Sequence, residues 1–71
     1  MATNNDVRSE VLGLLLAKVE SDQFPSVTMM DMIEKILRDE DVEGYAEILL
    51  DKVRSDTYPS MDLLRRLLNL A

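Results

Sequence analysis

Hydrophobic residues recur along the chain with the spacing of amphipathic helices. In a first segment they fall at positions 7, 11, 12, 15, 16 and 19, and in a third segment at 42, 45, 46, 49, 50 and 53. A second segment has them at 29, 30, 33, 36 and 37, and a fourth at 63, 64, 67 and 68. Such i, i+3, i+4, i+7 spacing places them on one side of a helix. The pattern therefore predicts an all-α protein with four helices.

The chain also matches itself at an offset of 34 residues. Residues 15–26 read LLAKVESDQFPS and residues 49–60 read LLDKVRSDTYPS, which are identical at eight of twelve positions. Short connections between helices favour antiparallel neighbours. We therefore expect two tandem, internally duplicated helical hairpins, about residues 6–38 and 39–71, that pack into one compact four-helix bundle. Residues 1–5 are expected to form a flexible tail before this single domain.

Each hairpin turn is predicted at a shared Ser-Asp-x-(Phe/Tyr)-Pro-Ser motif. The proline disfavours a helical conformation for the residue before it and so ends the incoming helix. The serine that follows can accept a hydrogen bond from a backbone N–H in the first turn of the next helix, which is the N-cap role. The predicted turn and cap residues are Phe24, Pro25, Ser26, Tyr58, Pro59 and Ser60.

The 34-residue offset equals the period of tetratricopeptide repeats. That family needs Trp, Leu-Gly, Tyr and Ala at fixed offsets and about three or more copies for stability. This chain has no Trp and only two copies, and its second copy lacks Leu-Gly. We treat the shared period as coincidental and assign no family.

Composition removes most kinds of catalytic and metal site. The 71 residues include neither cysteine, the source of thiolates, nor histidine, the source of imidazoles. These two residues are also the commonest zinc-binding side chains. The segment from Asp39 to Gly44 resembles the first half of a calcium-binding EF-hand loop, but loop position 12, which should be Glu, is Leu50. We expect a non-catalytic protein without metal or cofactor, in which this acidic segment caps the third helix.

Charge and hydropathy narrow the choice of partner and compartment. The net charge of −6 opposes binding to nucleic acid and anionic membranes. Residues 1–41 hold nine acids and four bases. We therefore expect the first half of the chain to be the acidic one. The longest apolar run spans only residues 11–17, and the polar N-terminus lacks the features of a secretion signal. A cytoplasmic location is expected.

The candidate binding residues lie on the first, second and fourth helices. Apolar side chains cover about 200° of the first helix, more than one core contact requires, and Leu14 and Leu16 mark the two edges of this arc. Met32 matches Arg66 at the 34-residue offset, so it is expected to be exposed. Arg65 and Arg66 lie in a Leu-Arg-Arg-Leu-Leu string that fits a groove-binding helix pattern, although its leucines are expected in the core.

These observations favour a small acidic protein–protein interaction module, such as an adaptor, inhibitor or regulatory subunit, which could also form a homodimer. The alternative is a nucleic-acid-binding transcriptional regulator with a helix-turn-helix-like hairpin. That alternative is weakened because the four bases of residues 42–71 are interleaved with acids, whereas a DNA-binding protein normally carries a basic stripe.

Overall fold

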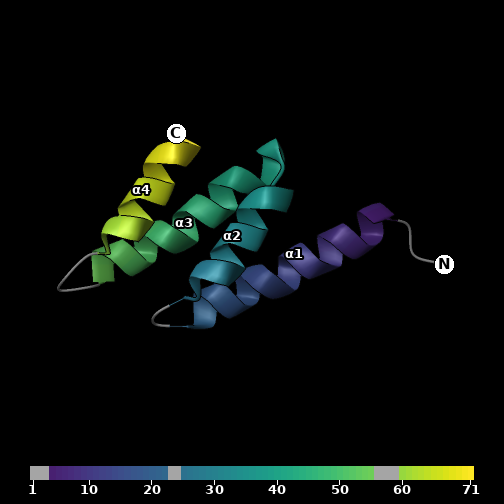
Figure 1. The fold of residues 1–71 in the computed structure, drawn as a ribbon, viewed down its shortest axis with the longest axis horizontal. Helices are drawn as coiled ribbons and strands as arrows, with labels where there is room; N and C mark the ends of the chain where they lie inside the picture. The colour runs from purple at the N-terminus through teal and green to yellow at the C-terminus, as the bar shows by residue number, and fades with distance from the viewer. Residues whose placement is uncertain (1–3, 23–24, 56–59) are drawn as a thin grey trace. The chain divides into compact units, whose positions relative to one another are not determined.

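The computed structural model describes residues 4–22, 25–55 and 60–71, with side chains from residue 7 onward. It contains four helices, α1 (Asn4–Ser21), α2 (Val27–Ile36), α3 (Asp39–Ser55) and α4 (Met61–Leu70) (Figure 1). The residues described include no strand, so the predicted all-α class is confirmed. None of these helices combines the length and the apolar character needed to cross a bilayer.

The chain divides into two compact units, Met1–Arg38 and Asp39–Ala71. Helix α1 contacts α2 in the first unit, and α3 contacts α4 in the second. Each unit is thus a helical hairpin, and the boundary between them agrees with the one expected from the sequence. Packing of the two hairpins into a single cooperative domain stays a prediction.

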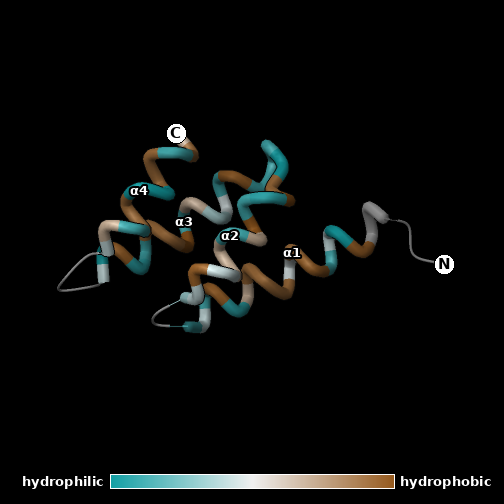
Figure 2. The backbone as a smooth tube through the Cα atoms, viewed as in Figure 1, coloured by the Kyte–Doolittle hydropathy of each residue, from teal (hydrophilic) through white to brown (hydrophobic). Residues whose placement is uncertain are grey.

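Each hairpin buries a small set of aliphatic and aromatic side chains. In α1 and α2 these are Leu12, Val19, Met30 and Ile33, and in α3 and α4 they are Tyr45, Leu49 and Leu63. Figure 2 shows hydrophobic segments recurring along each helix between hydrophilic ones, as the periodic pattern predicts. Met30 and Ile33 belong to the apolar set that predicts the second helix, and both are buried.

The second helix of each hairpin begins with a serine cap. The Ser26 hydroxyl accepts a hydrogen bond from the Met29 N–H at 3.3 Å, and the Ser60 hydroxyl accepts one from the Leu63 N–H at 3.3 Å. Both serines have extended backbone angles, as an N-cap residue requires. Their predicted role is confirmed. Of the other turn residues, Pro25 is half-buried, and Phe24, Tyr58 and Pro59 lie outside the described residues.

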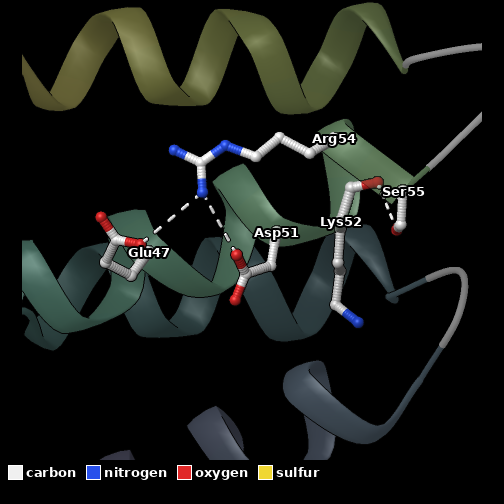
Figure 3. Close-up of polar contacts among 5 residues, drawn as sticks. All are labelled: Glu47, Asp51, Lys52, Arg54 and Ser55. Carbon is white, nitrogen blue, oxygen red and sulfur yellow. Dashed lines mark hydrogen bonds and ion pairs between the residues drawn. The ribbon is translucent and has the colours of Figure 1, made fainter.

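Serines also close the first helix of each hairpin. The Ser21 hydroxyl donates to the Lys18 carbonyl at 3.0 Å, and the Ser55 hydroxyl donates to the Lys52 carbonyl at 3.1 Å (Figure 3). Carbonyls in the last turn of a helix need partners beyond the regular helical hydrogen bonds, and these hydroxyls supply one. The Lys18 carbonyl also accepts from the Asp22 N–H at 3.0 Å. Each of these helices ends four residues before the proline of its motif.

One helix start differs from the sequence expectation, and another agrees with it. Helix α1 begins at Asn4, so Asn4 and Asn5 are helical and do not belong to a tail. Helix α3 begins at Asp39, which places Asp39, Glu40 and Asp41 in its first turn. Carboxylates there are favourable because the helix dipole is positive at this end. The segment that resembles part of an EF-hand loop is therefore helical.

Counted by hairpin, the second unit is more acidic than the first. The first unit holds six acids and four bases, a formal charge of −2, and the second holds eight acids and four bases, a formal charge of −4. The expectation of an acidic first half counted the start of α3 with the first hairpin. The second hairpin carries most of the negative charge.

Candidate protein interaction surfaces

Helix α1 carries two exposed apolar side chains on the side opposite its buried residues. Val7 is 49% exposed and Leu14 is 69% exposed. Residues seven apart point within about 20° of one another on a helix, whereas buried Leu12 and Val19 lie about 150° away from Leu14. Val7 and Leu14 are called the α1 outer stripe below.

Helix α4 repeats this arrangement with more apolar area. Met61 is 72% exposed and Leu68 is 77% exposed, and they too are seven residues apart. Leu64 is half-buried and lies between them on the same side of the helix. Met61, Leu64 and Leu68 are called the α4 outer stripe. The inner side of α4 buries Leu63, so this short helix is apolar on two sides.

The candidate binding residues chosen from the sequence lie at different places on the helices. Leu14 is exposed in the α1 outer stripe, and Leu16 is half-buried on the other side of that helix. Met32 is exposed, as expected, on α2, and Arg65 is exposed on α4 beside the outer stripe. The structure brings Arg65 next to an apolar surface within α4, whereas Leu16 and Met32 lie outside both stripes.

Arg66 is buried, although it was expected to be exposed. It is only 8% exposed, and its Nε donates to Asp62 Oδ2 at 2.8 Å, one turn earlier on α4. A buried guanidinium requires such a partner because an uncompensated charge in the interior costs several kcal/mol. Arg66 is thus buried within its hairpin. Met32 matches Arg66 at the 34-residue offset and was expected to be exposed because Arg66 was expected to be. Met32 is exposed, although Arg66 is not.

The outer side of α3 is acidic. Glu40, Glu43, Glu47 and Asp51 are exposed and fall within about 80° of one another around the helix. Arg54 lies on the same side, with Nη1 3.3 Å from Asp51 Oδ1 and 3.9 Å from Glu47 Oε2 (Figure 3). All three side chains are more than half exposed, so these ion pairs contribute little to stability. The acidic side of α3 is a solvated surface in which one arginine offsets part of the charge.

Four outer-stripe residues were not among the candidate binding residues from the sequence, namely Val7, Met61, Leu64 and Leu68. Their i, i+7 spacing was a usable signal, because two apolar residues so spaced on a helix with another apolar side need a second contact. Among the residues that the structure describes, the buried apolar side chains belong to the apolar sets predicted from the sequence, but the members of each set that reach solvent could not be read from the sequence. Within the residues that the structure describes, no three acidic side chains come close enough to hold a metal ion.

Comparisons with protein-family models, curated proteins and solved structures find no match to this chain.

Proposed function

We propose that this chain is a non-catalytic helical module that binds another protein through its outer stripes. The observation that carries the proposal is the exposure, between 49% and 77%, of Val7, Leu14, Met61 and Leu68 in two heptad-spaced pairs. Single exposed apolar residues are common on protein surfaces, but aligned sets usually mark an interaction site. A small domain also gains stability when such a surface is covered.

A comparison of matched positions on α2 and α4 supports this proposal. We infer that they are copies of one unit, from their sequence match at an offset of 34 residues. Met61 and Leu68 match Val27 and Glu34 at this offset, so α4 has leucine where α2 has a carboxylate. Leu68 is 77% exposed, so no side chain in the described part of the chain covers it. An apolar residue there is therefore better explained by a contact with a partner.

Nucleic acid is a poorer fit as the partner. Of the four bases in residues 42–71, Arg66 is buried against Asp62 and Arg54 is paired with two acids. A phosphate-binding surface needs exposed bases gathered on one side, and α4 offers Arg65 for this role. Retention on heparin that decreases steeply with salt would indicate phosphate-like binding and would contradict the proposal. The cytoplasm is the proposed compartment, and a chain without cysteine, which forms no disulfide, is compatible with its reducing conditions.

The proposal is tested with a charged side chain placed in each stripe. Leu14→Lys with Leu68→Lys adds two charges to the outer stripes, and Ser9→Lys with Asn69→Lys adds the same charge at exposed positions outside them. Tagged proteins are used to capture partners from the native host, and the captured protein is then purified and titrated directly. We expect the stripe variant to bind at least about tenfold more weakly, since one buried charge without a partner costs well over 1.4 kcal/mol.

The control variant should bind like the unmodified chain. Equal binding by all three proteins would show that the partner uses another surface. Circular dichroism of each variant establishes that the helical content is unchanged, so that a loss of binding is not a loss of fold.

A further inference from the structure

The two outer stripes have the same length and spacing. Val7 and Leu14 are separated by two helical turns, about 10 Å along the axis, and so are Met61 and Leu68. When one pair is set against the other, Val7 lies level with Met61 and Leu14 lies level with Leu68 in a parallel arrangement. The apolar side chains of each helix then meet those of the other along the whole stripe.

The residues beside the stripes are complementary in the same arrangement. On α1, exposed Glu10 lies about 50° to one side of the stripe, and half-buried Val11 lies about 50° to the other side. On α4, half-buried Leu64 lies about 50° from the stripe on the side that corresponds to Glu10. Exposed Arg65 lies about 50° away on the side that corresponds to Val11. When two parallel helices face each other, the clockwise side of one helix meets the counter-clockwise side of the other. Glu10 is therefore next to Arg65, and Val11 is next to Leu64.

We propose that the partner is a second copy of this chain, with the α1 outer stripe of one copy packed parallel to the α4 outer stripe of the other. This rests on the proposed function and names its occupant. Glu10 of one copy pairs with Arg65 of the other at the rim, while the apolar side chains form the centre. The net charge of −6 on each copy opposes association, and screening over about 8 Å at 0.15 M ionic strength reduces this repulsion.

The proposal is tested by light scattering during size-exclusion chromatography over a hundredfold range of concentration at about 0.15 M salt. The unmodified chain is expected to show a mass above the 8.1 kDa of one copy, rising with concentration. Leu14→Lys alone and Leu68→Lys alone should each give one copy at every concentration. Ser9→Lys and Asn69→Lys, which add the same charge outside the stripes, should associate like the unmodified chain.

Charge reversal tests the assignment of the two faces to each other. Glu10→Arg alone and Arg65→Glu alone should each weaken association roughly two- to fivefold, the scale of one exposed ion pair. The double variant Glu10→Arg with Arg65→Glu should restore it, because the pair is rebuilt with its charges exchanged. Neither residue belongs to the buried set of its hairpin, so each variant is expected to keep its fold.

A mass of one copy at all concentrations would overturn the proposal, and so would association that persists in Leu14→Lys and Leu68→Lys. Failure of the double reversal to restore association would overturn the pairing of the α1 face with the α4 face. A chain that stays monomeric but binds a different purified protein through Leu14 and Leu68 refutes the second copy as partner. That result leaves the proposed function standing.

Discussion

Arg66 Nε donates a hydrogen bond to Asp62 Oδ2 at 2.8 Å within α4. The arginine side chain is 9% exposed and the aspartate side chain is 38% exposed. A charged residue is thus kept inside the hairpin by a partner one turn away. The pair Arg54–Asp51 has a similar spacing in sequence, but both of its side chains lie mostly in solvent. Burial, and not spacing, makes the first pair matter for stability.

The first prediction concerns this buried pair. Asp62→Asn should destabilise the protein by about 1–2 kcal/mol, because a buried guanidinium loses a charged acceptor. Arg66→Met should change stability by less than about 1 kcal/mol, since replacing a buried ion-pair member by an apolar residue of similar length removes the desolvation cost as well. Urea denaturation measures both. In a double-mutant cycle, Asp62→Asn should have little effect when Arg66 is already methionine; an equally large effect there would show that Asp62 stabilises α4 in another way.

The serine caps make a second prediction. Ser26→Ala and Ser60→Ala should each destabilise the fold by about 1 kcal/mol, the usual scale for a lost N-cap side chain. Each hydroxyl accepts a hydrogen bond from the backbone N–H three residues later. Ser9→Ala, at an exposed site inside α1, is the matched control and should be neutral or slightly stabilising. Chemical denaturation in which both cap variants behave like the control would contradict the assigned caps.

Glycines inside helices give a third prediction. Gly13 lies in α1 and Gly44 in α3, and a Cβ atom built on either has no neighbouring atom within 4 Å. Neither has a positive φ. Gly13→Ala and Gly44→Ala should therefore each stabilise the protein by about 0.5–1 kcal/mol through reduced backbone entropy of the unfolded chain. Thermal unfolding measures the gain, and a loss in either variant would contradict the open space around these glycines.

The final prediction tests whether the two hairpins unfold together. Ile33 is fully buried in the first hairpin and Leu49 in the second. Ile33→Val should cost about 0.5–1.5 kcal/mol and Leu49→Ala about 2–5 kcal/mol. If the chain is one domain, both substitutions lower the same single transition in calorimetry. Two transitions, of which each substitution lowers only one, would show that the hairpins are independent.

The helices and their caps could be predicted because their determinants are local. The apolar spacing of α1 to α4 is readable within each segment, and Ser26 and Ser60 bond to backbone groups only three residues away. The burial of Arg66 could not be predicted from its match to Met32. It depends on Asp62, which is replaced by Thr28 in the first hairpin, and on the packing of α4 against α3. The Asp-x-x-x-Arg spacing was the available signal.

The outer stripes were only half predictable. An apolar arc of about 200° on α1 indicated that some leucines reach solvent, and Leu14 does. Leu16 is half-buried, because the hairpin packs against its edge of the arc. Which edge faces the neighbouring helix is decided by the angle at which α1 and α2 pack, and this angle is set by side-chain fit between helices distant in sequence.

One copy of the chain carries both the α1 outer stripe and the α4 outer stripe, which are different surfaces. Association between unlike faces is heterologous, so a first contact leaves one face of each kind unoccupied unless the geometry closes a ring. An open geometry would let copies add end to end as a filament. Each added copy brings a further charge of −6, so neighbouring copies repel one another at every contact, most strongly at low salt. Ionic strength would then set how long such an assembly grows.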